Sequence, residues 1–123
     1  MHLSSHQTLH WGLTQYADAL AQQEELVRLR IQKKIPNTLI LTEHHPIYTL
    51  GRRPESEKNI LKTNHIPVFY TNRGGDITYH GPGQIVGYAI IDLNQSRDLH
   101  AYLRLLEEVI IDSLSHIGLH SQR

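Results

Sequence analysis

From about Gln15 to Lys34, apolar side chains recur at helical spacing while polar side chains occupy the other face. Thr14 is a suitable N-cap for this segment, and Pro36 is a suitable stop signal. The pattern predicts an amphipathic helix that covers a sheet.

The most regular pattern is a broad apolar stripe between Leu99 and Ile117. Either Ser96 or Asp98 can cap this second helix, and Gly118 stands at the C′ position, where a left-handed residue commonly ends a helix. We expect the stripe to be part of the core.

Between the two helices, short runs of branched aliphatic and aromatic side chains predict strands. The runs are Thr38–Glu43, Ile47–Leu50, Val68–Thr71, Ile77–Tyr79 and Ile85–Leu93, the last of them longer and more buried. We expect a turn at Gly51–Pro54 and a short helix at Ser56–Leu61, capped by Ser56. Strands adjacent in sequence favour an α/β fold of the α+β type, with helices on one side of a mixed, largely antiparallel sheet.

Length and charge narrow the functional classes. The 123 residues fit one domain, 1–123, with one modest core. Twelve basic and twelve acidic residues give no net charge, which does not suggest a nucleic-acid or membrane-surface partner. No apolar run is long enough for a transmembrane helix, and residues 1–6 lack the features of a signal or transit peptide. We therefore expect a cytoplasmic protein that binds neither nucleic acid nor membranes.

The sequence contains no cysteine, which removes disulfides, thiolate metal sites and thiol nucleophiles from these residues. Ten histidines are many for this length, but their spacing matches no zinc motif. His116 and His120 have helical spacing, although Gly118 between them is expected to end the helix. We expect no metal site.

The segment Arg73–Gln84 holds four of the eight glycines and groups several hydrogen-bonding side chains between strands. One interpretation is a glycine-rich hairpin, with Asn72–Asp76 as its turn and Pro82 as a stiffener after it. The other is a binding site, because glycines let the backbone approach another molecule closely.

Within this segment the string Arg-Gly-Gly, two further residues, and Thr-Tyr-His-Gly-Pro-Gly-Gln resembles the signature of the lipoyl(octanoyl) transferase family, the octanoyl-[acyl-carrier-protein]:protein N-octanoyltransferases. A second block, Glu43–Arg52, also resembles this family, although His45 stands where members often carry a proline. The resemblance covers the chain from about Tyr16 onward. It implies the catalytic fold that these transferases share with biotin and lipoate protein ligases.

The resemblance also implies a reaction and its partners. An octanoyl group leaves octanoyl-acyl carrier protein, rests on an enzyme cysteine, and passes to a lysine of the lipoyl domains of 2-oxoacid dehydrogenases or of the glycine cleavage H protein, without a cofactor. By similarity, the substrate-binding segment is Arg73, Gly74, Gly75, Asp76, Ile77, Thr78, Tyr79 and His80, and the pocket wall behind it is Gly81, Pro82, Gly83 and Gln84.

Individual roles within this segment stay open. The paired glycines would let an acyl chain lie against bare backbone, and their N–H groups could face the thioester oxygen. Arg73 either orients the loop or meets the pantetheine arm. His80 is either a hydrogen-bond donor or a general base. Thr78 and Tyr79 alternate in a regular strand, so only one of them should face the ligand.

The chain departs from the family in one respect. The resemblance places a nucleophilic cysteine and a lysine that tunes it further along the chain, but this sequence has no cysteine, and its lysines, at 33, 34, 58 and 62, all precede the signature. We expect the N-terminal part of a catalytic domain, truncated at its C-terminus, without catalytic residues of its own and inactive alone.

Three alternatives remain. One is an ATP-dependent lipoate or biotin protein ligase, although those enzymes tend to carry a third consecutive glycine and lack the Gly-Pro-Gly-Gln continuation. Another is a non-catalytic remnant that binds an acyl group or a carrier protein. The last is a degenerate product with no activity and an unstable core.

Overall fold

The computed structural model describes residues 5–95 and 97–123. Ser96, one of the two predicted caps, lies outside the described residues, as do residues 1–4, on which part of the leader-peptide argument rested. The chain divides into two compact units, Met1–Ile91 and Asp92–Arg123, which we call the N-terminal and C-terminal units. The expectation that residues 1–123 form one domain stays a prediction.

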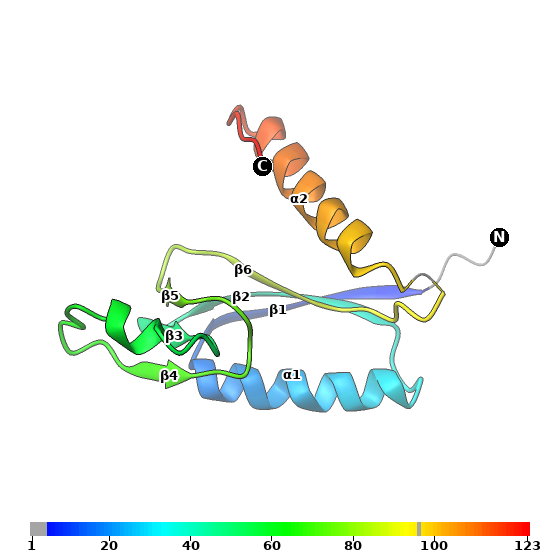
Figure 1. The fold of residues 1–123 in the computed structure, drawn as a ribbon. Coiled ribbons are helices and arrows are strands. Elements are labelled where there is room, and N and C mark those ends of the chain that lie inside the picture. Colours follow the sequence, from blue (N-terminus) through cyan, green and yellow to red (C-terminus); the bar gives the residue numbers. More distant parts are fainter. Residues whose placement is uncertain (1–4, 96) are drawn as a thin grey trace. The chain divides into compact units, whose positions relative to one another are not determined.

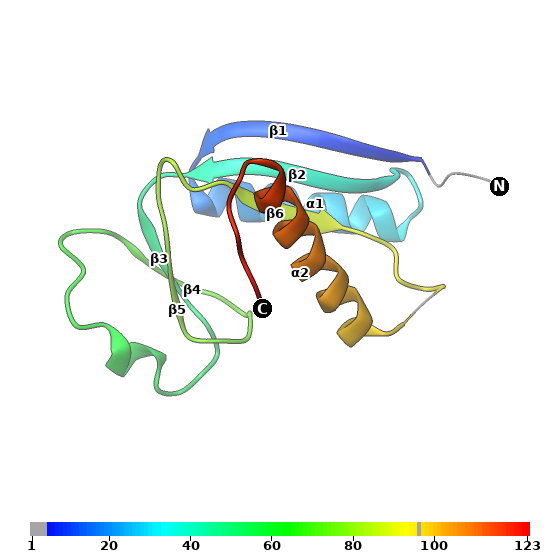
Figure 2. The ribbon, with the colours of Figure 1, turned by 90° about the horizontal axis from the view of Figure 1, so that it is seen from above.

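The larger sheet of the N-terminal unit has the strand order β1-β2-β6. It is built from β1 (His6–Thr14), β2 (Asn37–His44) and β6 (Val86–Ile90). β1 runs parallel to β2, whereas β6 runs antiparallel to it. Helix α1 (Tyr16–Ile31) lies along one face of this sheet (Figures 1 and 2) and buries Ala19 completely. Alternate side chains of β2 are buried, as expected for a central strand with one covered face.

The smaller sheet has the order β4-β3-β5. Its strands are β3 (Ile47–Leu50), β4 (Val68–Tyr70) and β5 (Ile77–His80), and the short 3-10 helix η1 (Ser56–Asn59) lies in the connection between β3 and β4. β3 is parallel to β4 and antiparallel to β5. Because β4 and β5 flank β3 instead of pairing with each other, the hairpin interpretation of Arg73–Gln84 is wrong. The predicted α/β class with mixed pairing is confirmed, in two sheets instead of one.

Three predictions for local structure need correction. β1 was not predicted, and Thr14 belongs to it; the N-cap of α1 is Gln15, without a side-chain cap bond. β6 is shorter than expected, and Ile85 lies before it, 71% exposed instead of buried. Ser56 is a buried residue of η1, whose N-cap is Glu55.

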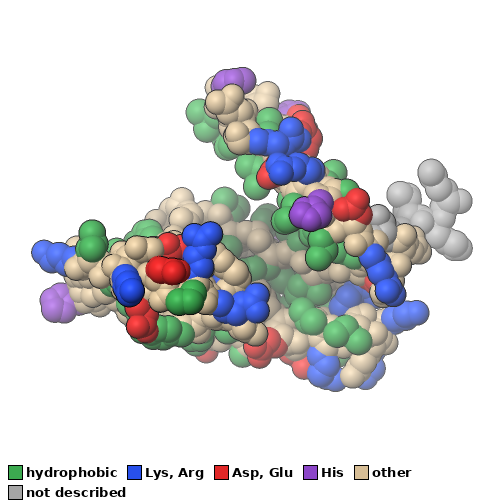
Figure 3. Space-filling model, in the orientation of Figure 1, with side chains coloured by type: hydrophobic (Ala, Val, Ile, Leu, Met, Phe, Trp, Pro, Cys, Tyr) green, Lys and Arg blue, Asp and Glu red, His purple; other side chains and the backbone are tan. Residues whose placement is uncertain are grey.

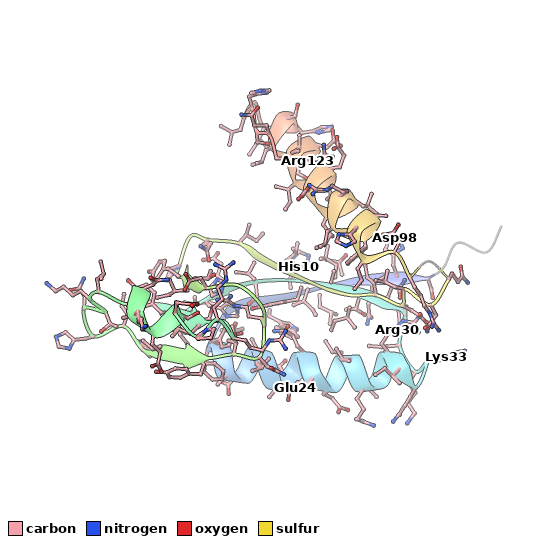
Figure 4. All side chains as sticks on the ribbon, in the orientation of Figure 1. His10, Glu24, Arg30, Lys33, Asp98 and Arg123 are labelled. Carbon is pink, nitrogen blue, oxygen red and sulfur yellow. The ribbon has the colours of Figure 1, made fainter. Side chains whose placement is uncertain are left out.

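The C-terminal unit consists of α2 (Leu99–His116) and its flanking segments. The Asp98 carboxylate accepts a hydrogen bond from the Ala101 N–H at 2.9 Å, and Gly118 has φ +81°, so the predicted cap and stop are confirmed. Arg123 returns to pair with Glu107, and Figure 4 marks both Asp98 and Arg123.

The expectation that the α2 stripe is core is wrong for this unit, because no α2 residue is buried. A single helix with a short tail has too little surface to cover a stripe that continues over its whole length. Among the described residues, neither helix combines the length and apolar character that a membrane crossing requires.

Candidate functional site

The loop between β4 and β5 crosses the end of β3 and is held there by main-chain hydrogen bonds. The Arg52 N–H donates to the Arg73 carbonyl, and the Gly51 N–H donates to the Asp76 carbonyl, each at 2.9 Å. On the other side, Thr71 N–H donates to the Leu50 carbonyl at 2.9 Å. The first part of the predicted site is therefore attached to a central strand and is not a free loop.

The Arg73 guanidinium secures the same loop. Its Nη2 donates to the carbonyl and the hydroxyl of Thr49, at 2.8 and 3.0 Å, and its Nη1 donates to the Gly74 carbonyl at 2.8 Å. Thr49 is fully buried, so these bonds tie a half-buried cation to the core of the small sheet. Of the two roles considered for Arg73, orienting the loop is the one that these contacts perform.

The paired glycines pack against a third glycine. A Cβ atom on Gly51 would lie 2.1 Å from the Gly75 carbonyl oxygen, so only glycine fits at the end of β3. Gly75 has φ +83°, a left-handed conformation that favours glycine, whereas Gly74 has open space beside it. The backbone of Gly74 and Gly75 is thus fixed on one side and exposed on the other.

Strand β5 presents different side chains on its two faces. Tyr79 contacts Tyr48, with ring centroids 5.4 Å apart, and an open cavity of about 380 Å³ adjoins them. Its lining is Tyr48, Asn59, Ile60, Leu61, Lys62, Ile77 and Tyr79. His80 contacts other rings, those of Tyr16 and His44. Since adjacent strand residues point to opposite faces, Thr78 shares the face of His80 and Tyr79 does not.

The Gly-Pro-Gly-Gln string forms a turn. The Gln84 N–H donates to the Gly81 carbonyl at 3.1 Å, and Gly83 has φ +87°, which with Pro82 before it matches a type II turn. The Glu43 carboxylate accepts a hydrogen bond from the Gly83 N–H at 2.8 Å. The predicted pocket wall is thus a defined turn fastened to β2.

Beside this turn, four aromatic side chains from four elements meet: Tyr16 of α1, His44 of β2, His80 of β5 and Tyr88 of β6. We call them the histidine–tyrosine cluster. His44 lies at its centre, 0% exposed, with its ring centroid 5.3 Å from Tyr16, 5.5 Å from His80 and 5.8 Å from Tyr88. Tyr16 also stacks on His80 at 6.1 Å. The strand register brings these residues together, because Thr14 pairs with His44 and Ile47 pairs with His80.

Both nitrogens of the buried His44 ring have partners. Nε2 lies 2.7 Å from the Tyr88 hydroxyl, and Nδ1 lies 3.0 Å from the Thr14 hydroxyl. Burial, and secondly the neighbouring His80, lower the pKa of His44, although a hydrogen bond with the Thr14 backbone opposes this. Burial, and secondly Tyr16, raise the pKa of Tyr88 to about 12. At neutral pH, Tyr88 therefore keeps its proton, and its hydroxyl pairs with Nε2 of a neutral His44.

Arg73 of the loop acts electrostatically on Tyr16 of the histidine–tyrosine cluster. Burial raises the pKa of Tyr16, and the positive charge of Arg73 opposes this shift. The loop that displays Gly74 and Gly75 is therefore within electrostatic reach of the ring that stacks on His80. A fixed cation and exposed backbone N–H groups near aromatic rings are groups that can orient a ligand with a polar carbonyl.

Part of this arrangement coincides with the segment predicted from the sequence, whose role in binding stays a prediction. Arg73, the glycines, His80 and Gln84 were predicted, whereas Tyr16, His44 and Tyr88 were not assigned to the site. Tyr16 was read as part of the apolar face of α1, and His44 as part of a family block. Each of these residues carries a polar tip at a position that is buried, for His44, or half-buried, for Tyr16 and Tyr88, and a buried polar tip needs a partner.

Other surfaces of the N-terminal unit lie apart from this site. Arg30, Lys33 and Lys34 line an open cavity of about 380 Å³ at the C-terminal end of α1, opposite the end that carries Tyr16 (Figure 4). Over the part built from β3 to β5, basic and acidic side chains are interspersed (Figure 3). Within residues 5–95 and 97–123, no three His, Asp or Glu side chains come close enough together to hold a metal ion.

Comparison with known proteins gives a consistent result. The octanoyltransferase of Rubrobacter xylanophilus is 50% identical over 118 residues, which cover 91% of this chain and 53% of that protein. That of Syntrophotalea carbinolica is 49% identical over 113 residues, with the same coverage of 91% and 53%. That of Gloeobacter violaceus is 44% identical over 114 residues, covering 91% of this chain and 51% of that protein. The chain spans about half the length of the curated relatives it matches.

A sequence model of a protein family also matches most of the chain. The matched residues are 15–123, which include every element of the structure except β1. Both the loop held by Arg73 and the histidine–tyrosine cluster lie within them. The chain therefore belongs to the lipoyl protein ligase A/B catalytic domain family.

Proposed function

We propose that this chain provides the acyl-binding half of an octanoyltransferase. The complete reaction moves an octanoyl group from octanoyl-acyl carrier protein to a lysine of lipoyl domains, in 2-oxoacid dehydrogenases and the glycine cleavage H protein. The main support is that relatives named octanoyltransferase are 44–50% identical to this chain, and that the string from Arg73 to Gln84 lies within the aligned half. We place the reaction in the cytoplasm.

The geometry of the site supports a role in binding a thioester. The exposed backbone of Gly74 and Gly75 offers N–H donors on a loop that cannot easily move, because Arg73 and Gly51 hold its other side. Preorganised donors of this kind stabilise the oxyanion of an acyl-transfer reaction by about 2.7–4 kcal/mol each. In the proposal, Arg73 to His80 contact the substrate and Gly81 to Gln84 form the wall behind it.

The nucleophile of the reaction is not among these residues. Residues 1–123 contain no cysteine, so an acyl-thioester intermediate cannot form on them. Transfer by this polypeptide therefore needs a second segment that supplies a thiol.

A fusion experiment tests the proposal. The chain is joined to the second half of the Rubrobacter xylanophilus octanoyltransferase and incubated with octanoyl-acyl carrier protein and a lipoyl domain, whose mass is then measured. We expect ATP-independent octanoylation by the fusion and none by the 123-residue chain alone. Robust transfer by the chain alone would contradict the assignment of the nucleophile to the other half.

Matched arginine variants of the fusion separate the site from general effects. Arg73→Met removes the cation that holds the loop, and we expect a strong loss of transfer, whereas Arg53→Met changes an exposed arginine of the preceding turn and should have little effect. Equal activity of the two variants would contradict the proposed role of the loop.

A lipoate or biotin protein ligase is the second candidate, because the matched family includes ligase A as well as ligase B. The same fusion distinguishes the two functions. Modification of the acceptor from free lipoate or biotin, dependent on ATP, would favour the ligase. Binding of octanoyl-pantetheine without any transfer by the fusion would favour a non-catalytic acyl-binding module.

A further inference from the structure

We propose that Gln84 is a positioning residue that fixes the proton of His80 on Nδ1 and leaves Nε2 as a hydrogen-bond acceptor for the substrate. Only one part of the inference rests on the proposed function, namely that a substrate group donates the hydrogen bond to Nε2 of His80. It concerns the tautomer of one imidazole, which hydrogen-bond partners decide.

The orientation of the Gln84 amide follows from its two neighbours. Its Nε2 lies 3.1 Å from the Tyr79 carbonyl, and its Oε1 lies 2.9 Å from the His80 Nδ1. A carbonyl oxygen only accepts, so the amide nitrogen must face Tyr79 and the amide oxygen must face His80. An amide oxygen also only accepts, and therefore Nδ1 of His80 carries the proton.

Reversing the amide would be unfavourable. It would place two oxygens, of Gln84 and Tyr79, against each other and remove one hydrogen bond. The backbone of Gln84 is also held, since its N–H donates to the Gly81 carbonyl and the Glu43 carboxylate binds the preceding Gly83 N–H. Glu43 thus supports the position of Gln84 across the turn.

The consequence is a free lone pair in the candidate site. Within the described part of the chain, Nε2 of His80 has no hydrogen-bond partner, although the residue is half-buried. The titratable rings that face His80 are Tyr16 from α1 and His44 from β2, and Arg73 acts on Tyr16 from the loop. Nε2 is therefore suited to accept a hydrogen bond from an N–H group of the substrate. Of the two roles considered for His80, the general base agrees with this geometry, because a base needs an unprotonated ring nitrogen, whereas Nε2 without its proton cannot donate.

Nitrogen NMR of the ligand-free chain tests the tautomer directly. Spectra that correlate ring carbon-bound protons with both imidazole nitrogens are recorded at pH 8.5, about two units above the usual pKa of histidine. The His80 signals are assigned by their loss in His80→Asn. We expect a pyrrole-type Nδ1 and a pyridine-type Nε2, the reverse of the preference of histidine in water.

Two substitutions of Gln84 supply the decisive comparison. Gln84→Met removes the acceptor and should return His80 to the Nε2-protonated form, whereas Gln84→Glu keeps an acceptor and should keep the Nδ1 proton. Gln22→Met, on the exposed face of α1, is the matched control and should leave His80 unchanged. Wild-type His80 with its proton on Nε2, or a tautomer unaffected by Gln84→Met, would overturn the inference.

The outcome is separable from that of the proposed function. A confirmed tautomer in a chain whose fusion transfers no acyl group would leave the role of Gln84 standing and remove the transferase proposal. An active fusion with the wrong tautomer would do the opposite.

Discussion

Several polar side chains in this protein are more deeply buried than most of its apolar ones. Thr38, Thr42, His44 and Thr49 are at most 3% exposed. Buried polar groups are stable only when they are hydrogen-bonded, and His44 achieves this with hydroxyl groups from two other strands. The stability of the buried His44 ring therefore depends on two single oxygen atoms, those of the Thr14 and Tyr88 hydroxyl groups.

Tyr88→Phe tests that dependence. It removes the hydroxyl that pairs with His44 and leaves a buried ring nitrogen unpaired, so we expect a loss of about 1–3 kcal/mol in the free energy of unfolding. Tyr70→Phe, at an exposed position, is the matched control and should change it by less than about 0.5 kcal/mol. Urea unfolding measures both, and equal effects would show that the bond to His44 contributes nothing.

Lowering the pH should destabilise the fold through His44. Because burial and His80 lower its pKa below the usual 6.5, the unfolded state binds more protons, and stability is lost as the pH falls below about 6.5. We expect the free energy of unfolding to be smaller at pH 5.5 than at pH 7.5. His44→Gln removes this titration, so its loss over the same interval should be smaller; an equal loss would assign the dependence to other groups.

At the scale of elements, the site is organised by β3, which lies between β4 and β5 and supports the loop that joins them. Gly51 directly follows β3, and a Cβ atom there would collide with the carbonyl oxygens of both Gly74 and Gly75. The fit of three glycines sets the path of the loop.

Gly51→Ala should disturb this path. Its Cβ meets backbone atoms, which cannot rotate away, so we expect a destabilisation at the upper end of the about 1–3 kcal/mol typical of overpacking. Gly74→Ala is the matched control, because its Cβ meets open space, and should stay within about 0.5 kcal/mol. Thermal unfolding measures the stability of both variants. A similar loss of stability in Gly51→Ala and Gly74→Ala would show that the loop can shift to accept the Gly51 Cβ atom.

The cap of α2 gives a separate prediction for the C-terminal unit. Asp98→Ala removes the acceptor of the Ala101 N–H and should cost about 1 kcal/mol of helix stability. Asp98→Ser keeps a capping acceptor and should retain most of the helix stability. Asp112→Ala, an exposed change near the other end of α2, should not reduce the helix stability. Hydrogen exchange at the Ala101 amide reports the effect, and unchanged exchange in Asp98→Ala would contradict it.

The sequence was informative where the signal is local. Branched aliphatic runs located β2, β3 and β5 to within two residues, and Asp98 and Gly118 located the ends of α2. β1 was missed because histidines and glutamine interrupt its alternating Leu9 and Trp11, so that packing instead of propensity determines the strand. The histidine–tyrosine cluster was missed because its members come from four separate elements, and only strand register brings them together.

At the scale of the whole molecule, the chain combines the loop for which we propose a binding role with the absence of a cysteine thiol. The loop, the turn and the cluster lie in the N-terminal unit, and the family match extends from residue 15 to residue 123. We propose that these features bind an acyl-pantetheine thioester without reacting with it.

Titration of the isotope-labelled chain with octanoyl-pantetheine tests this claim most directly. We predict chemical-shift changes concentrated at the amides of Gly74 and Gly75 and at the His80 ring, with the mass of the protein unchanged. Pantetheine without the octanoyl group is the control. Shift changes confined to the cavity beside Tyr48 and Leu61, or no shift changes with octanoyl-pantetheine, would contradict the proposal.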